Sequence, residues 1–261
     1  GSTVYIVANA RVSVTREKVN GAPFRQLALG GKLAVGLGED GVLRDLDTGQ
    51  VLRGEEDRMP EGTAFETGAA QGNLVLMSGP NGVLLHDVSA RHFDFLPPQA
   101  LQSALPLLDP GNRIVGLGPG FGLVNSIKGA IYSVEIEGDF LNHSIATTQI
   151  GKVNGPLRSL SVSGSTIWLV DAQGVPWRAV SGAGPVPLVG PRLQGGDPGF
   201  RLATSNGSEV IFASGRNILN YDPVERSWVG SWQAPSPTPL IDMTFWNHLF
   251  VASQSGAVHQ L

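Results

Sequence analysis

The segment TIWLVDAQGVP (166–176) decides the fold, because five other segments of the chain align with it without a gap. The other copies are LAVGLGEDGVL (33–43), LVLMSGPNGVL (74–84), FGLVNSIKGAI (121–131), EVIFASGRNIL (209–219) and HLFVASQSGAV (248–258). Successive copies begin 39–47 residues apart. A repeat of this length indicates similar supersecondary units along the chain, none of which can bury its own faces alone.

The ninth position of the repeat marks a turn between two strands. It is occupied by Gly41, Gly82, Gly129, Gly174, Asn217 and Gly256. Glycine and asparagine tolerate a positive φ, so this position predicts a tight turn. The continuous apolar run before it predicts a strand buried on both faces. The residues after it alternate, as in Leu43 and Arg44, which predicts a half-exposed strand.

Further strand-like segments before and after each copy complete an antiparallel unit of four strands, the content of one propeller blade. The longer phrase TIWLVDAQGVPWR (166–178) resembles the repeats of six-bladed NHL-like β-propellers. This resemblance implies an all-β fold of six four-stranded blades. Seven blades remain an alternative, because TVYIVANARV (3–12) also fits the repeat. The last copy ends without an outer strand, so we expect the N-terminal strand at 3–14 to complete the last blade.

One segment interrupts the rhythm of strands. Leu101, Ala104, Leu105 and Leu108 recur at helical spacing after a pair of prolines, which predicts a short helical insertion near 98–108. We otherwise expect a single β-propeller domain over 1–261. Gly1-Ser2 has the form of a scar left by tag cleavage, so we expect a domain excised from a longer, bacterial protein.

Composition excludes several classes of function. The net charge of −4 without a basic cluster argues against binding of nucleic acid. No apolar run approaches the ~18 residues of a membrane span. The absence of cysteine excludes disulfides and thiol chemistry, and it is compatible with the cytoplasm, the periplasm or secretion. Localisation and oligomeric state therefore stay open.

No motif predicts a catalytic residue, a bound metal or a cofactor. The glycine-rich run 116–122 leads into a strand rather than a helix, and the loop 45–49 lacks the distal ligands of a calcium loop. Two alternatives stay open. One is a metal-dependent propeller hydrolase or lactonase with central ligands drawn from Asp171, Asn125 and Asp242. The other is a lectin-like protein that uses its tryptophans, which are Trp168, Trp177, Trp228, Trp232 and Trp246.

The residues just before the ninth position vary in size and charge from copy to copy. A surface that binds a protein or peptide tolerates such variation. These residues lie in the turn between the second and third strands of each blade, which we call the b–c turn. We therefore expect a non-catalytic interaction scaffold whose partner binds the face carrying the b–c turns. The predicted contact residues are Glu39, Asp40, Asn81, Lys128, Gln173, Arg216 and Gln254.

Overall fold

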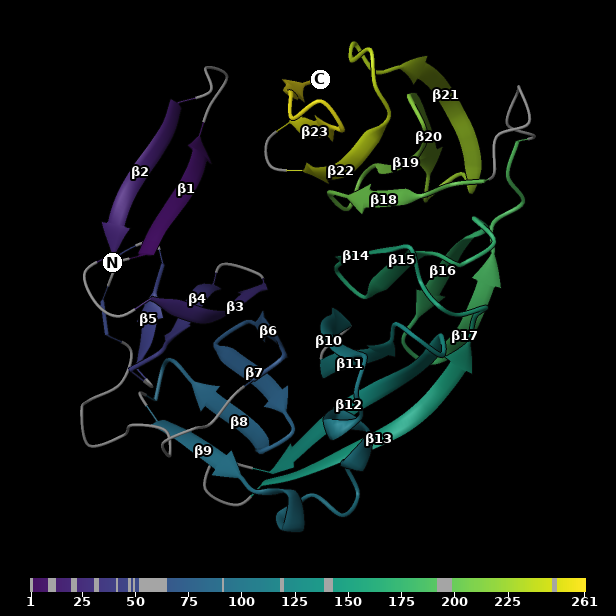
Figure 1. Cartoon of the computed structure of the whole chain (residues 1–261). Coiled ribbons are helices and arrows are strands. Elements are labelled where there is room, and N and C mark those ends of the chain that lie inside the picture. Colours follow the sequence, from purple (N-terminus) through teal and green to yellow (C-terminus); the bar gives the residue numbers. More distant parts are fainter. Residues whose placement is uncertain are drawn as a thin grey trace. The chain divides into compact units, whose positions relative to one another are not determined.

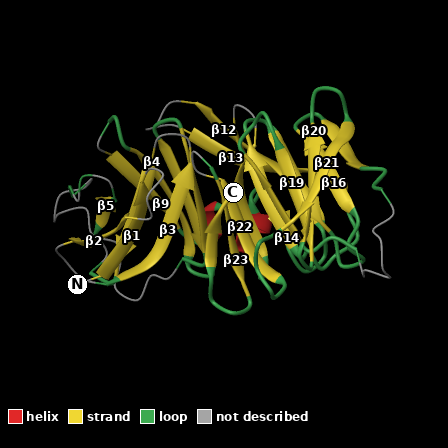
Figure 2. Ribbon diagram, turned by 90° about the horizontal axis from the view of Figure 1, so that it is seen from above, coloured by secondary structure: helices red, strands yellow, loops and turns green. Residues whose placement is uncertain are grey.

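The computed structural model describes residues 2–8, 13–19, 23–30, 33–40, 42–46, 48, 50–51, 65–90, 92–117, 120–138, 143–191, 199–245 and 248–261. These residues form antiparallel strands and turns (Figure 1), with two short 3-10 helices among them (Figure 2). No helix in the described residues is long and apolar enough to span a membrane.

The strands form one sheet after another along the chain. In the described part, β1 (Ser2–Ala8) and β2 (Ser13–Val19) form a hairpin, and β3 (Phe24–Gly30), β4 (Leu33–Gly38) and β5 (Leu43–Asp45) form a three-stranded sheet. A four-stranded sheet follows, with β6 (Thr67–Gln71), β7 (Leu74–Gly79), β8 (Gly82–Asp87) and β9 (His92–Leu96). The next contains β10 (Asn112–Leu117), β11 (Gly120–Asn125), β12 (Ala130–Gly138) and β13 (His143–Lys152).

The C-terminal half continues the same order. A four-stranded sheet contains β14 (Ser159–Ser163), β15 (Thr166–Val170), β16 (Pro176–Val180) and β17 (Ala183–Pro187). Another contains β18 (Leu202–Ser205), β19 (Val210–Ser214), β20 (Asn217–Asp222) and β21 (Ser227–Gln233). The last described sheet has β22 (Leu240–Phe245), β23 (Leu249–Ser253) and β24 (Val258–Gln260). Over the described residues, six sheets of three or four strands thus confirm the six predicted blades.

The chain divides into two compact units. Unit 1 comprises Gly1–Gly116, Gly120–Leu123 and Ser133–Thr148, and unit 2 comprises Leu117–Pro119, Val124–Tyr132 and Gln149–Leu261. Each unit contains successive sheets of the repeat. Whether the whole chain is one domain stays a prediction.

The prediction for the N-terminal strand is wrong. Residues 2–8 pair in antiparallel register with residues 13–19, from Ser2 opposite Val19 to Ala8 opposite Ser13. They form a two-stranded sheet of their own, whereas β24 is the last strand of its three-stranded sheet in the described part. Two β-rich segments a few residues apart need to close only a short loop, which costs less chain entropy than pairing with the distant C-terminal strand.

The insertion near 98–108 is helical as predicted, but it forms two 3-10 turns, η2 (Pro98–Ala100) and η3 (Leu105–Leu108). Its buried side chains are those of Leu101, Ala104 and Leu107, which are spaced three residues apart. This spacing matches the three residues per turn of a 3-10 helix, in which positions i and i+3 share a face. Leu105, predicted to be on the apolar face, is 53% exposed.

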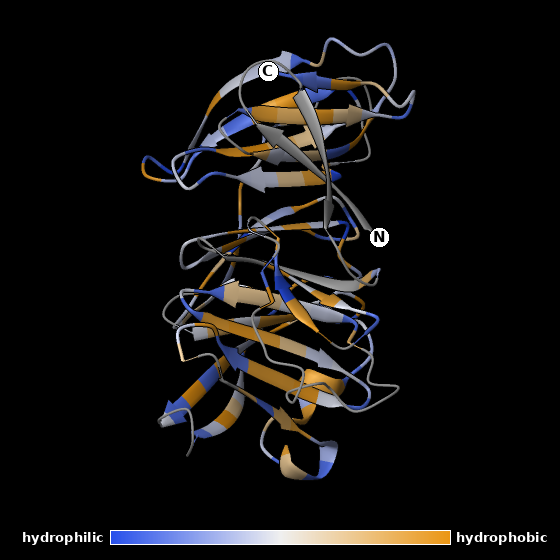
Figure 3. Cartoon of the chain, turned by 90° about the vertical axis from the view of Figure 1, so that its left-hand side faces the viewer, coloured by the Kyte–Doolittle hydropathy of each residue, from blue (hydrophilic) through white to orange (hydrophobic). Residues whose placement is uncertain are grey.

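The second strand of each sheet is the most buried, as the apolar runs predicted. Every residue of β19 is buried, and so is all of β7, β11 and β15 after the first residue. Figure 3 shows hydrophobic residues along the strands and hydrophilic ones in many of the turns. On β19 a neighbouring sheet packs against each face, so burial of its side chains holds successive sheets of unit 2 together.

Side chains from adjacent sheets form the cores. In unit 1, Val35 and Leu37 of β4 pack with Val75 and Met77 of β7. In unit 2, Trp168 and Val170 of β15 belong to one cluster with Val210 and Phe212 of β19. A further cluster combines Ile211 and Ala213, on the other face of β19, with Met243 and Val251 of the last sheet. A single strand thus contributes to two cores through its alternate side chains.

The ninth position adopts a positive φ at four described glycines, with values of 138° at Gly82, 70° at Gly129, 80° at Gly174 and 83° at Gly256. Gly41 lies outside the described residues. Asn217 is an exception and has no positive φ. In its two-residue turn, which the pairing of Ser214 with Asn217 closes, Gly215 has the positive φ instead, at 58°. Glycine first in a two-residue hairpin turn suits the type II′ geometry, so the glycine requirement has moved by two positions.

Gly174 is needed for space as well as for φ. A Cβ atom added there would lie 2.7 Å from the Cα of Gly199. Gly164 has a similar positive φ of 55° but no atom within 4 Å of such a Cβ. We therefore expect Gly174→Ala to lower the free energy of unfolding by about 2–4 kcal/mol, against about 1 kcal/mol for Gly164→Ala. Equal losses in denaturant unfolding would contradict the close packing at Gly174.

Candidate functional site: the hydrogen-bonded rim

The b–c turns of unit 2 are hydrogen-bonded to the segments that connect one sheet to the next. The amide of Val153 donates to the carbonyl oxygen of Gly129 at 2.9 Å, in the turn between β11 and β12. The following residue of the same connector, Asn154, accepts a hydrogen bond from the amide of Ala172 at 3.4 Å. One connector therefore joins two successive b–c turns.

The next connector repeats this arrangement. The amide of Phe200 donates to the carbonyl oxygen of Gly174 at 2.9 Å. The carbonyl oxygen of Gly199 accepts from the hydroxyl of Ser214 at 2.7 Å, at the start of the following turn. The turns at 171–174 and 214–216 are thus joined through residues 199–200.

The third connector reaches the last sheet. The amide of Leu240 donates to the carbonyl oxygen of Gly215 at 2.8 Å, and Pro239 accepts from the amide of Gln254 at 2.9 Å. We call the rim the four turns 126–129, 171–174, 214–216 and 253–256 together with the connectors 153–154, 199–200 and 239–240. All of it belongs to unit 2. The hydrogen bonds form one unbroken series, so these four turns lie beside one another in order.

Within the turns, short polar side chains hold the backbone. Asp171 is fully buried, and its Oδ1 accepts from the amides of Gln173 and Val175 at 2.9 and 2.8 Å. Its Oδ2 accepts from the indole nitrogen of Trp177 at 2.9 Å. Asn125 accepts in the same way from the two amides that follow Ser126, at 3.0 and 2.6 Å. Such side-chain caps fix the turn backbone in one conformation.

The predicted contact residues of unit 2 lie at the tips of these turns. Lys128, Gln173 and Gln254 are exposed. Arg216 is exposed as well, and its guanidinium donates to the carbonyl oxygen of Ala234 at 3.3 Å. The turns therefore present two cationic and two amide side chains on a backbone fixed by hydrogen bonds.

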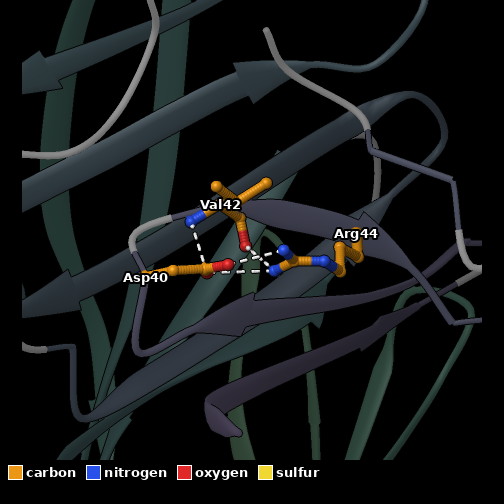
Figure 4. A network of polar contacts seen from close by, with 3 residues as sticks. All are labelled: Asp40, Val42 and Arg44. Atoms are coloured by element: carbon orange, nitrogen blue, oxygen red, sulfur yellow. Dashed lines mark hydrogen bonds and ion pairs between the residues drawn. The ribbon is translucent and has the colours of Figure 1, made fainter. Parts of the chain in front are cut away.

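The three predicted residues of unit 1 differ from one another. Glu39 and Asn81 are exposed in their turns, and the amide of Glu39 donates to the carbonyl oxygen of Pro23 at 2.8 Å. Asp40 instead forms a two-pronged ion pair with Arg44, with distances of 2.5 and 3.0 Å (Figure 4). Asp40 also accepts from the amide of Val42 at 3.1 Å. The carboxylate of Asp40 therefore stabilises the turn in which it lies.

This ion pair explains why Arg44 is not on the exposed side of its strand. The alternating pattern predicted an exposed Arg44, but its side chain is 8% exposed, against 27% for Asp40. The hydrogen bonds from Arg44 hold the pKa of Asp40 below its ordinary value of 3.8. A charged side chain can be buried when such a paired acceptor compensates its lost hydration.

The residues proposed for a metal site have structural contacts. Oδ1 of Asp171 and the amide oxygen of Asn125 accept hydrogen bonds from their own turns, and Oδ2 of Asp171 accepts from Trp177 and Asn154. Asp242 is exposed on β22 and accepts from the amide of Met243. Among the residues that the structure describes, no group of three or more His, Asp or Glu side chains could hold a metal ion.

The tryptophans proposed for sugar binding also pack within the sheets. Trp168 is buried, Trp177 donates to Asp171, and Trp228 stacks on Phe200 with 5.3 Å between ring centres. Trp232 is 38% exposed on the outer strand β21. Trp246 lies outside the described residues.

Sequence reasoning missed the connectors as part of the rim. Residues 153–154, 199–200 and 239–240 share no motif, and they lie about 25 residues from the turns that they contact in the preceding sheet. Gly199 and Pro239 carry a weak signal, because glycine permits close approach and proline favours extended backbone. Neither signal specifies which turn the connector meets.

Solved structures similar to this chain are propellers. The WD40 domain of SCAP from fission yeast has 13% identity and a TM-score of 0.61, covering 88% of this chain and 58% of that chain. YCF48 bound to the D1 peptide has 15% identity and a TM-score of 0.55, covering 91% and 77%. The Neurospora crassa Pan2 WD40 domain has 14% identity and a TM-score of 0.55, covering 91% and 74%.

No protein-family model and no curated protein sequence matches this chain. The structural likeness at such low identity shows the fold alone. The chain is a β-propeller repeat protein, as the resemblance of its repeats implied.

The ion pair of Asp40 generates a prediction with a defined pH dependence. Asp40→Asn should lower the free energy of unfolding by about 1–3 kcal/mol at neutral pH, because it leaves the nearly buried Arg44 without its carboxylate. Because folding lowers the pKa of Asp40, the stabilisation is present above 3.8 and is lost as the pH falls through the folded value. Urea unfolding at several pH values measures both effects.

The exposed Asp109 provides the control. Asp109→Asn should change stability by less than about 0.5 kcal/mol at every pH. A difference between Asp40→Asn and the wild type that persists undiminished at pH values well below 3.8 would contradict the role of the ionised carboxylate.

A second prediction separates a turn role of Asp171 from a metal role. Asp171→Ala should lower the free energy of unfolding by about 2–4 kcal/mol, because it leaves four donors without their acceptor. Asn206→Ala, in an exposed turn with similar side-chain caps, should cost only about 1 kcal/mol or less. Calcium and a chelator should leave the wild-type unfolding midpoint unchanged. A calcium-dependent rise that Asp171→Ala abolishes would support a metal site instead.

Proposed function

We propose that this chain is a non-catalytic interaction module, and that a protein or peptide partner binds across the tips of its b–c turns. The observation that carries this proposal is the rim of unit 2. Its backbone is held by connectors and side-chain caps, whereas Lys128, Gln173 and Gln254 are exposed at its surface. A surface of this kind binds without a large ordering cost, because the positions of its contact groups are already set.

The chemistry of the turn tips supports a partner rather than a small substrate. The tips combine ammonium, guanidinium and amide groups, which donate or accept hydrogen bonds along an extended chain. An enzyme site would bring several polar groups together on one reacting atom. In the described residues, the buried carboxylate of Asp171 instead accepts hydrogen bonds from its own turn, from Trp177 and from Asn154.

One similar structure is consistent with this class of function. YCF48 was solved bound to the D1 peptide, so a propeller of comparable fold binds a peptide. We extend only the class of ligand to this chain. Glu39, Asp40 and Asn81 are proposed as contact residues of the b–c turns of unit 1, with Asp40 acting through its effect on the turn.

The proposal can be tested with peptides selected from a random library against the immobilised chain. A combined variant with Lys128, Gln173, Arg216 and Gln254 each replaced by alanine should bind the selected peptides at least about tenfold more weakly. Loss of a few well-placed contacts accounts for most of the affinity at such surfaces. The unfolding midpoint should stay close to that of the wild type, because these side chains are exposed.

The control variant carries Ser165→Ala and Glu225→Ala, both at exposed turns at the opposite ends of their strands. It should bind the selected peptides as the wild type does. Equal binding by the rim variant and the wild type would overturn the proposal, since the peptides would then have selected another surface.

A further inference from the structure

We infer that unit 2 carries a second binding site, away from the rim, which accepts an acidic side chain of a peptide together with an apolar neighbour. The site is a groove of about 240 Å³ between the outer part of the sheet β14–β17 and the next sheet. Arg178, Tyr221 and Arg226 line it together with Val186 and Val189. The inference does not depend on the function proposed for the rim.

No carboxylate of the described residues forms an ion pair with either arginine of the groove. Within the described residues, the one ion pair is that of Asp40 and Arg44. The Nε of Arg178 is buried without a hydrogen-bond partner there, and its guanidinium lies 5.9 Å from the centre of the Trp168 ring. A buried guanidinium nitrogen without an acceptor is costly, so a ligand oxyanion that approaches it gains more than it would at an exposed arginine.

The carboxylate of Asp222, next to Tyr221 in the sequence, accepts hydrogen bonds from its own turn. Asp222 accepts from the amides of Val224 and Glu225 at 2.8 and 3.0 Å and so caps the turn before β21. Arg226 follows in that turn with a φ of 53°. The lining of the groove itself holds two guanidinium groups and no carboxylate, with one arginine from a strand and one from a turn.

Tyr221 adds a neutral donor. Burial raises the pKa of the Tyr221 hydroxyl above its ordinary value, so the group stays protonated at neutral pH. A hydroxyl donor beside two guanidinium groups matches the lone pairs of a carboxylate.

The remaining wall is apolar and exposed. Val186 belongs to β17 and is 59% exposed, and Val189 follows β17 and is 93% exposed. The backbone below them is fixed, because the indole nitrogen of Trp228 donates to the carbonyl oxygen of Val189 at 2.8 Å. The groove is smaller than the roughly 300–1,000 Å³ of typical small-molecule pockets. It therefore suits a few side chains of a longer partner, an acidic one beside an apolar one.

The test compares three probes: the capped tripeptide Leu-Glu-Leu, its Leu-Gln-Leu counterpart and inorganic phosphate. An NMR titration follows the indole N–H of Trp228, which reports on Val189. We expect Leu-Glu-Leu to shift this signal and Leu-Gln-Leu to bind at least about tenfold more weakly, because hydrogen bonds to charged groups contribute more than neutral ones. Equal binding of the two peptides would overturn the inference. Phosphate acting at the same concentrations as Leu-Glu-Leu would also overturn it, in favour of a simple anion site.

Variants locate the site. Arg178→Gln and, separately, Arg226→Asn should each weaken binding of Leu-Glu-Leu at least about tenfold; asparagine is chosen at 226 because it tolerates a positive φ. Arg113→Gln, an exposed arginine on β10, and the combined rim variant should bind as the wild type does. Wild-type affinity in Arg226→Asn, whose exposed side chain leaves the core intact, would contradict the site even if Arg178→Gln unfolds.

Discussion

The close contact between each b–c turn and the connector to the next sheet is the constraint on which the rest of unit 2 depends. At Gly174 the two backbones approach so closely that a Cβ atom would overlap Gly199, and the Phe200 amide completes the contact by a hydrogen bond. Buried backbone groups must find partners, and here they find them between consecutive sheets. Sheets of unit 2 that follow one another in the sequence therefore also lie beside one another in the fold.

This arrangement separates stability from recognition. Backbone atoms, glycines and buried caps such as Asp171 hold the turns, whereas exposed side chains such as Gln173 take no part in that framework. Exposed positions of this kind can vary in sequence at little cost in stability. Asp40 in unit 1 is the exception, because its carboxylate is needed by Arg44. A varied turn residue is therefore not always available for binding.

Side-chain packing fills the space between sheets and leaves the groove at its outer side. Phe200, Phe212 and Trp228 contact one another beneath Val189, with Trp228 stacked on Phe200. Large aromatic rings bury much apolar surface but do not fill every corner of an interface between two twisted sheets. At this corner Arg178 and Tyr221 come from the third strands of adjacent sheets. Unlike the rim, the groove is therefore built from side chains rather than from backbone.

The repeat alone determined the all-β blades, the buried second strands and the glycine turns, because short stretches of sequence are enough to show the hydrophobic periodicity and the residues that permit a positive φ. The folded structure decided the pairing of β1 with β2, the burial of Arg44 by Asp40, and the shift of the glycine requirement from Asn217 to Gly215. It also decided which connector meets which turn, and it brought Arg178 and Arg226 to one groove. The first three of these features depend on the register of a hairpin or a turn, and the last two depend on contacts between residues far apart in sequence. Neither kind of contact leaves a periodic pattern in the chain.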